Sequence, residues 1–286
     1  MTGARTATMN LPGMPSRIDR NFVFTDADFA RVRHLIRERA GIALGAHKRE
    51  MVYSRLSRRL RSLSMHSFTE YLDGLEASAV HPEWEAFVNA LTTNLTAFFR
   101  EPHHFPVLAE FVRGLGRPVN VWCAAASTGE EPYSIAITLL EALGPHAARS
   151  RVYASDIDTQ VLDTARAGVY SAERVAKMEA ARLQRFFLKG TGPRAGMVRV
   201  KPEVAALVEF ERVNLLDERW ALPCRFDAVF CRNVMIYFDK PTQARILARM
   251  EPWVEPGGLL FAGHSENLTY VTQAFVLRGQ TVYQRV

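Results

Sequence analysis

Cysteines and long apolar segments are both scarce in this sequence. Its 286 residues include three cysteines, Cys123, Cys224 and Cys231, without CxxC spacing or a histidine at ligand spacing. An odd, scattered set of this kind argues against a disulfide framework and against a zinc site. No apolar run is long enough to cross a bilayer, and the stretch up to Arg17 lacks a hydrophobic signal core. We therefore expect buried, reduced thiols, no metal site, no direct membrane insertion and a cytoplasmic location.

A glycine-rich phosphate loop is also missing, although a strand, a short loop and a helix are predicted at residues 119–143. The segment VNVWCAAASTGEE (119–131) begins as a buried strand and continues into small residues with one glycine, no lysine and two acids. Pro132 is typical of the first position of a helix. Acids here disfavour phosphate and suit a cationic, hydroxyl-bearing ligand such as S-adenosylmethionine. A simple packing turn, found in any α/β protein, explains the same segment.

Acidic residues are scarce between positions 31 and 61, where ten lysines and arginines accompany only two glutamates. The whole chain has a formal net charge of +6, so its excess charge is concentrated in this segment. The polar side of a predicted helix over residues 47–64 carries four of these cations, Arg55, Arg58, Arg59 and Arg61. Such a face fits an acidic protein surface or nucleic acid, and a merely solvated helix face is the alternative. Aromatic residues do not alternate with these arginines as in a platform for single-stranded nucleic acid.

The periodicity divides the chain into parts. Residues 1–20 lack regular patterning and predict a flexible tail. Residues 21–90 predict an all-helical domain, with helices over 27–40, 47–64, 67–75 and 82–91. In residues 91–286, predicted strands alternate with predicted helices. The strands are expected at 119–123, 151–158, 208–213, 226–231, 259–262 and 281–285, and the helices at 133–143, 159–167 and 242–254. The predicted fold class is a doubly wound, Rossmann-like α/β domain preceded by a helical domain.

Polar residues follow several of these strands. Asp156 lies near the end of the second strand, at a spacing from Gly129 typical of a carboxylate that binds ribose hydroxyls. Asn214 and Arg232 follow the next two strands. Because the carboxyl ends of parallel strands meet at one edge of a sheet, we expect these side chains to line one ligand crevice together with Ala124.

A polar segment with several aromatic residues, TTNLTAFFREPHHF (92–105), precedes the central strand. Asn94 and Thr96 offer short hydrogen-bonding side chains, and Arg100 offers a fixed cation. His103 and His104 are a candidate metal pair, but neighbouring residues point apart on a helix. We therefore expect these two histidines to cap or pack.

Residues 171–207 interrupt the alternation and predict a small inserted antiparallel β-subdomain. The sequence KGTGPRAGMVRV (189–200) combines glycines with alternating valines, which predicts a hairpin. Gly190, Gly192 and Gly196 would leave the edge of this glycine-spaced strand unobstructed, and an extended peptide can pair with such an edge. A decorative loop is the alternative.

Taken together, the motifs resemble one family. TTNLTAFFREPHHFPVL, AAASTGEEPYSIAI, ASDID, VNLL, FDAVFCRNVMIYFD and PGGLLFAGHSENL, in this order, resemble the bacterial chemotaxis receptor methyltransferases of the CheR type. The resemblance extends from about Phe22 to Val286. It implies a helical domain joined to a methyltransferase domain with a β-subdomain. The implied activity is methyl transfer from S-adenosylmethionine to glutamate side chains of chemotaxis receptors, with S-adenosylhomocysteine as the product.

The resemblance also implies roles for individual residues and partners. The implied cofactor contacts are Asn94, Thr96, Arg100, Glu131, Asp156, Asn214, Leu215, Arg232 and Asn233. Arg100 and Tyr237 resemble the pair near the transferring methyl group. The implied partners are the cytoplasmic domains of membrane receptors, including a C-terminal receptor tail that pairs with the glycine-spaced strand, and the enzyme is recruited to receptor clusters. The basic helix is our candidate for docking acidic receptor helices.

Glutamate chemistry agrees with this set of residues. A glutamate side chain is already ionised at neutral pH, so its methylation needs positioning and no general base. Two other function classes stay open. A nucleic-acid methyltransferase is disfavoured because CRNVMIYF (231–238) lacks the Asn/Asp-Pro-Pro-aromatic signature of amino methylation, so we expect no nucleic-acid partner. A non-catalytic adaptor is disfavoured because every implied cofactor contact is present.

Overall fold

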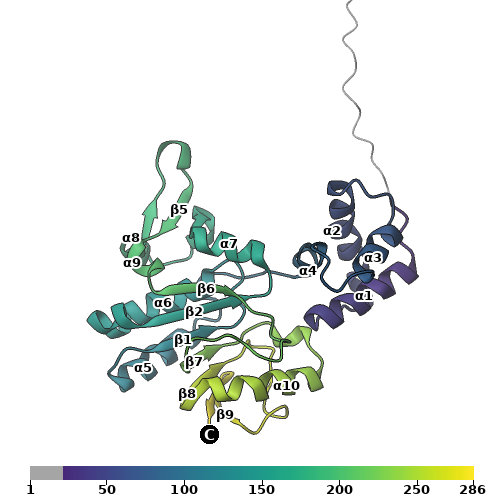
Figure 1. Ribbon diagram of the computed structural model, residues 1–286. Helices are drawn as coiled ribbons and strands as arrows, with labels where there is room; N and C mark the ends of the chain where they lie inside the picture. The colour runs from purple at the N-terminus through teal and green to yellow at the C-terminus, as the bar shows by residue number, and fades with distance from the viewer. Residues whose placement is uncertain (1–21) are drawn as a thin grey trace, which may run out of the picture.

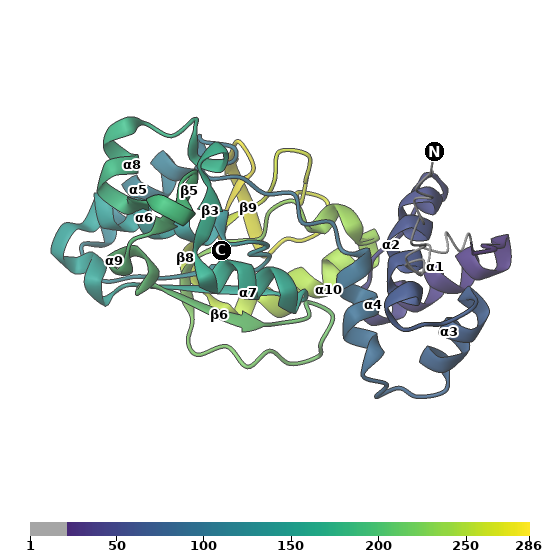
Figure 2. The same ribbon diagram turned by 90° about the horizontal axis from the view of Figure 1, so that it is seen from above.

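A computed structural model describes residues 22–286, and the flexible tail predicted over residues 1–20 lies outside the described residues. The chain forms a helical domain and a larger α/β domain that lie side by side (Figure 1). Turning the molecule by 90° shows that helix α10 of the α/β domain lies next to the helical domain (Figure 2). Within residues 22–286, no helix has the length and apolar character needed to cross a membrane.

The helical domain is built from α1 (Asp26–Ala40), η1 (Ala46–Lys48), α2 (Arg49–Ser62), α3 (Phe68–Glu76) and α4 (Glu83–Leu91). Thr25 caps α1 in a capping box with Asp28, and Gly41 ends it in a left-handed conformation, as its sequence predicts. The predicted helix over 47–64 is shorter, because its first turn is the separate 3-10 helix η1. Apolar side chains of all four α-helices share one core.

The α/β domain is organised on a seven-stranded sheet with the order β6-β2-β1-β7-β8-β10-β9. Its strands are β1 (Asn120–Cys123), β2 (Arg151–Asp156), β6 (Val208–Arg212), β7 (Phe226–Phe230), β8 (Val254–Phe261), β9 (Phe275–Gly279) and β10 (Val282–Arg285). The first five are parallel, and β10 pairs antiparallel with both β8 and β9. The strand order reverses between β1 and β7, which is where ligands bind in doubly wound sheets.

Helices cover both faces of this sheet, as the doubly wound fold class requires. Val121 and Cys123 of β1 join the core beneath α5 (His104–Leu115), α6 (Glu130–Leu143) and α7 (Thr159–Ala167). Trp122 points to the opposite face, where α10 (Lys240–Met250) packs. Burial on both faces explains why the central strand reads as an uninterrupted apolar run.

Helix α6 begins earlier than its sequence suggests. Pro132 was expected at the first helical position, but the helix starts at Glu130 after Gly129, whose φ is +97°. A side chain at position 129 would meet the Tyr170 hydroxyl at 2.7 Å and Ala165 at 2.9 Å. A glycine is therefore required here both by the backbone conformation and by the packing.

The small inserted sheet has the order β3-β5-β4, from β3 (Val169–Ser171), β4 (Phe187–Lys189) and β5 (Met197–Val200). It also carries η3 (Ala172–Val175), α8 (Ala180–Phe186) and α9 (Pro202–Ala205), and its β4-β5 hairpin projects away from the main sheet (Figure 1). The prediction of one glycine-spaced edge strand over residues 189–200 is wrong, because only Lys189 of this range belongs to an edge strand, β4. β5 is the central strand, and the three glycines lie in the β4-β5 connection around η4 (Gly192–Arg194).

The chain after residue 240 also differs from its predicted elements. The helix expected over 242–254 ends at Met250, followed by η6 (Glu251–Trp253), and β8 starts at Val254 rather than 259. The strand accommodates Pro256 through an irregular register against β7. Strand β9 was not predicted, because its exposed residues, such as Leu277 and Arg278, lack the alternation of a half-buried strand.

Candidate functional site

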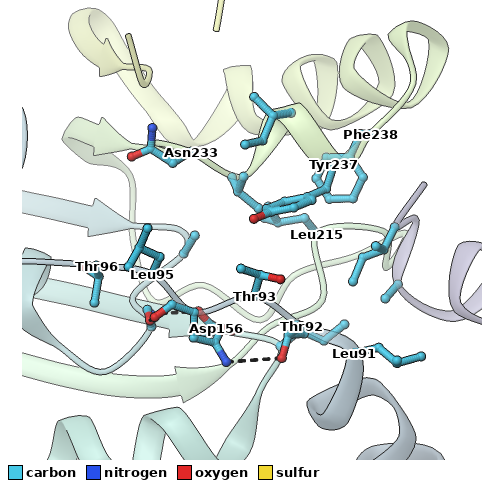
Figure 3. Close-up of a pocket in the computed structure, with 18 of the residues that line it drawn as sticks. Leu91, Thr92, Thr93, Leu95, Thr96, Asp156, Leu215, Asn233, Tyr237 and Phe238 are labelled. Carbon is cyan, nitrogen blue, oxygen red and sulfur yellow. Dashed lines mark hydrogen bonds between the residues drawn. The ribbon is translucent and has the colours of Figure 1, made fainter. Parts of the chain in front are cut away.

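A cavity of about 300 Å³ lies at the carboxyl edge of the parallel strands, next to the helical domain. All ten residues that the resemblance assigns to the cofactor or the methyl group line it: Asn94, Thr96, Arg100, Glu131, Asp156, Asn214, Leu215, Arg232, Asn233 and Tyr237. Figure 3 shows Asn233 and Tyr237 on one side of the cavity and Asp156 and Thr96 on the opposite side. Its volume is in the range of small-molecule sites.

Asp156 stands at the end of β2 and is 9 % exposed. One carboxylate oxygen accepts the Ser127 N–H at 2.8 Å, and the other accepts the Asp158 N–H at 3.0 Å. Burial raises the pKa of Asp156 above its usual value, although these two N–H donors favour the charged form. The loop after β1 is thereby tied to the carboxylate that faces the cavity.

Glu131 and Arg232 form a buried ion pair across the strand-order switch. An Arg232 guanidinium nitrogen lies 2.7 Å from a Glu131 carboxylate oxygen, and the Cys123 thiol lies 3.4 Å from the other oxygen. Arg232 also donates to the Arg100 carbonyl at 2.7 Å and lies 3.3 Å from the Glu101 carboxylate. Burial raises the pKa of Glu131, and the adjacent Arg232 cation opposes that rise. The pair fixes the first turn of α6 against the loop after β7.

Two of the expected contacts hold the walls of the cavity together. The Asn94 amide donates to Asp158 at 2.8 Å, which ties the segment before α5 to the N-cap of α7. The Asn214 amide donates to the Arg39 carbonyl at 2.9 Å and accepts the Leu216 N–H at 3.0 Å. Both ends of the Asn214 side chain are therefore occupied by protein groups.

Glu266 is a site residue that the sequence analysis missed. It is buried, and its carboxylate accepts the backbone N–H groups of Gly263 at 2.6 Å, Asn233 at 2.8 Å and Met235 at 2.8 Å. These bonds hold Asn233 at a φ of +57° and start η5 (Met235–Tyr237). The motif GHSENL contained this acid, but only the fold brings it beneath the loop after β7.

The helical domain supplies a wall of the cavity, which the sequence also did not indicate. Ala43, Lys48 and Met51 line it. The Ala43 N–H donates to the Tyr237 carbonyl at 2.9 Å. Phe238 packs so closely on Gly41 that an added Cβ would lie 2.8 Å from its ring. The position of Tyr237 thus depends on contacts from both domains.

Arg100 and Tyr237 are both half-buried in the cavity. The Arg100 guanidinium donates to the Leu95 carbonyl at 2.9 Å, a bond that leaves its other N–H groups available for a ligand. Carboxylates, a guanidinium and a phenol therefore face apolar walls formed by Ile157, Leu215 and Phe238. This donor set fits a nucleoside that carries hydroxyl groups and a cationic centre.

Two expectations outside the cavity require correction: that the four arginines of α2 form one free basic face, and that His103 and His104 point apart. Arg55 donates to the carbonyls of Ala90 and Thr92, and Arg59 pairs with buried Glu83, so these two arginines stabilise the helical domain. Arg58 is exposed. The expectation that His103 and His104 point apart is also wrong.

His103 immediately precedes α5 and its backbone is already helical, with φ −63° and ψ −21°, so a break in the helix does not account for the meeting of the two rings. The two ring centroids lie 4.2 Å apart.

Comparison with known proteins identifies the family. The CheR methyltransferase all-alpha domain matches residues 27–92, and the CheR methyltransferase SAM binding domain matches residues 94–284. A chemotaxis protein methyltransferase of Klebsiella aerogenes is 58 % identical over 99 % of this chain and 96 % of its own length. That of Salmonella typhimurium is 57 % identical over 93 % of both chains, and chemotaxis protein methyltransferase 2 of Pseudomonas aeruginosa is 54 % identical over 93 % of this chain and 95 % of its own. The chain therefore belongs to the CheR methyltransferase family, and it is an S-adenosylmethionine-dependent methyltransferase.

Proposed function

We propose that this enzyme methylates glutamate side chains on the cytoplasmic domains of membrane chemotaxis receptors, forming γ-methyl esters. The observation that carries the proposal is the convergence of all ten family-motif residues on one cavity at the β1/β7 switch. The close relatives are named chemotaxis protein methyltransferases over nearly their whole length. The division of labour that we propose assigns the receptor contacts to residues 21–90 and the inserted subdomain, and methyl transfer to residues 91–286.

Within the cavity, we assign the ribose hydroxyls of the cofactor to Asp156 because its carboxylate is buried, ordered and directed inward. When bound, S-adenosylmethionine supplies an electrophilic methyl group on a sulfonium. Arg100 and Tyr237 orient the glutamate carboxylate, which arrives ionised and needs no proton acceptor. A strong electrostatic hold on that carboxylate would oppose transfer, because the charge is neutralised during the reaction. The transfer step in this proposal accordingly uses no metal.

Methyl transfer to a carboxylate gives a product that is labile in mild base. Receptor-bearing membranes incubated with the enzyme and labelled S-adenosylmethionine should release labelled methanol on alkaline treatment. Label that survives base would indicate N-methylation instead, and membranes without receptors should remain unlabelled. Failure of receptor labelling by an enzyme that binds the cofactor normally would point to a non-catalytic adaptor.

We assign the docking of acidic receptor helices to the side of α2 that carries Arg58, which is exposed beside a groove between α2, α4 and α7. Arg55 and Arg59 are unsuitable for a charge-reversal test because their partners are within the domain. Arg58→Glu should therefore lower receptor methylation most at low salt, where exposed charges are least screened. The control is Arg219→Glu, an exposed arginine of the α/β domain. Equal activity of both variants at low salt would remove α2 from the docking surface.

A receptor tail peptide would add to the outer edge of β4. The Gly190 N–H donates to Met197 and the Lys201 N–H donates to Phe186, so residues 186 and 190 are bonded toward β5. The Phe187 N–H already donates to the Leu183 carbonyl at the end of α8, so by the alternation of antiparallel ladders the Lys189 N–H is the donor of β4 that faces outward. Lys189→Pro should abolish peptide binding, whereas Lys189→Ala should retain it. Recruitment to receptor clusters would depend on this contact, and peptide binding by the proline variant would place the tail elsewhere.

A further inference from the structure

Glu101, His103 and His104 form a cluster beside the cavity, without lining it. One potential ligand atom from each residue lies within 4.8 Å of the other two. Glu101 and His103 lie in the turn that leads into α5, and His104 is the first residue of that helix. His264 adjoins the cluster, because its Nδ1 lies 3.0 Å from a Glu101 carboxylate oxygen.

The tautomer of His104 follows from its surroundings. The ring is fully buried, and its Nε2 lies 3.0 Å from the Gln280 carbonyl oxygen, which can only accept a hydrogen bond. Nε2 therefore carries the proton, and Nδ1 presents a lone pair.

Among residues 22–286, the Nδ1 lone pair of His104 has no hydrogen-bond partner. This atom is buried without a hydrogen bond and lies 3.9 Å from a carboxylate oxygen of Glu101. A lone pair facing a carboxylate is unfavourable unless a positive or proton-donating species lies between them. An imidazole that donates its other N–H to a backbone carbonyl is also the usual arrangement of a metal-binding histidine, because that bond fixes the ring orientation.

Glu101 already has several partners, and these contacts compete with a bound metal ion for its carboxylate. Its carboxylate accepts from the His264 N–H at 3.1 Å and from the Asn233 amide at 3.2 Å, and it lies 3.3 Å from Arg232. Arg232 is closer to Glu131, at 2.7 Å. One guanidinium thus serves two carboxylates, which leaves negative charge on the side of Glu101 that faces the histidines.

We propose that Glu101, His103 and His104 bind a divalent transition-metal ion, with zinc as the best match. Two imidazoles and one carboxylate suit zinc, whereas magnesium and calcium prefer oxygen ligands. His264 is the candidate for a fourth ligand, because its side chain is 68 % exposed and its Nδ1 lies 3.0 Å from Glu101. The site is separate from methyl transfer, because none of the three ligands lines the cofactor cavity.

The test is metal binding by the full-length, untagged protein after removal of metals with a chelator. Zinc is titrated in competition with a chromogenic chelator, and cobalt absorption reports the coordination geometry. The wild type should bind one equivalent of zinc and show visible cobalt bands. His103→Ala should weaken zinc binding about tenfold or more and lose those bands, with unchanged S-adenosylmethionine affinity.

The matched control is His146→Ala, which removes an exposed histidine outside the cluster. It should bind zinc like the wild type. His103→Gln, which keeps a polar side chain, serves if the alanine variant does not fold. Zinc binding that is equal in the wild type and both His103 variants, or absent in the wild type at equimolar zinc, would overturn the proposal.

Discussion

At the scale of single residues, the cavity is lined by an ionised side chain that backbone N–H groups orient and stabilise. This side chain is Asp156, because two N–H groups orient its carboxylate before any ligand arrives. Such preorganisation lowers the cost of binding, since the acceptor does not have to be ordered by the ligand.

Asp156→Asn should weaken S-adenosylmethionine binding by about 1.5–3 kcal/mol, the value of a hydrogen bond to a charged group. Asparagine keeps one acceptor oxygen but sets its NH₂ group against the second backbone donor, so the unfolding midpoint should fall while the protein still folds. Isothermal titration calorimetry measures the affinity, and thermal unfolding checks the fold. Wild-type affinity in a folded Asp156→Asn protein would contradict the assignment to ribose.

The pH dependence of binding gives a second test of Asp156. Because burial raises its pKa above the usual 3.8, the carboxylate becomes protonated earlier on acidification than an exposed aspartate. Cofactor affinity that relies on the charged form is present at neutral pH and falls as the pH drops toward this raised pKa. Asp156→Asn should lack this decline, and a decline of equal size in both proteins would assign it to another group.

Tyr237→Phe should lower turnover while cofactor affinity stays within a few-fold of the wild type. The hydroxyl faces the cavity, and an orienting contact made mainly in the transition state affects turnover rather than binding. Steady-state kinetics and calorimetry on the same preparation separate the two quantities. Equal loss of cofactor binding would make Tyr237 a cofactor contact, and unchanged turnover would remove it from the reaction.

At the scale of elements, the loop between β7 and α10 is held by one buried carboxylate. Glu266 binds three N–H groups of this loop and of the turn after β8. The loop carries both Asn233 and Tyr237, so its geometry sets part of the cavity. A glutamine at position 266 has one acceptor oxygen and adds a donor where donors already converge.

Glu266→Gln should therefore reduce the free energy of unfolding by about 1.5–3 kcal/mol for a lost charged hydrogen bond, and lower turnover as the loop loosens. Glu218→Gln is the control, because Glu218 is exposed and its substitution should leave both quantities unchanged. Urea unfolding and receptor methylation are the measurements. Wild-type turnover in Glu266→Gln would show that the loop keeps its geometry without this acid.

At the scale of the whole molecule, the two domains share the cavity through a small set of contacts. Arg37 pairs with Asp239 at 2.5 Å, the Asn214 amide binds the Arg39 carbonyl, and the Ala43 N–H binds the Tyr237 carbonyl. These contacts place the end of α1 against the loop that carries Tyr237. Cofactor binding and domain packing should therefore be coupled.

Gly41→Ala tests this coupling. Gly41 has a φ of +69°, and a Cβ there would lie 2.8 Å from the Phe238 ring. We expect a cost of about 1–2 kcal/mol from the backbone conformation alone, together with lower turnover because the loop is displaced. Gly74→Ala, in α3 with nothing within 4 Å, should leave turnover unchanged. Thermal unfolding and receptor methylation are measured for both variants. Normal turnover in Gly41→Ala would show that the close contact between Gly41 and Phe238 is not needed for activity.

Local sequence patterns are sufficient to predict the type and order of most elements and the polar residues at the strand ends. Caps such as Thr25 and Gly41 act within one turn of a helix, so they can be predicted locally. The apolar residues of β1 likewise predict a strand that is buried on both faces. Alternation of strands and helices then places Asp156, Asn214 and Arg232 at one edge, because parallel strands share their direction.

Which of these groups contact one another depends on long-range packing, which local patterns do not contain. The pairing of β5 between β3 and β4, the Arg59–Glu83 pair and the wall that Ala43 and Met51 add to the cavity all join segments that are distant in sequence. Glu266 beneath the loop after β7 belongs to the same class, because it is about thirty residues away from the N–H groups that it accepts. A local pattern records how exposed a residue must be, but not which distant partner fills the space, because that partner is selected by the packing of the whole chain.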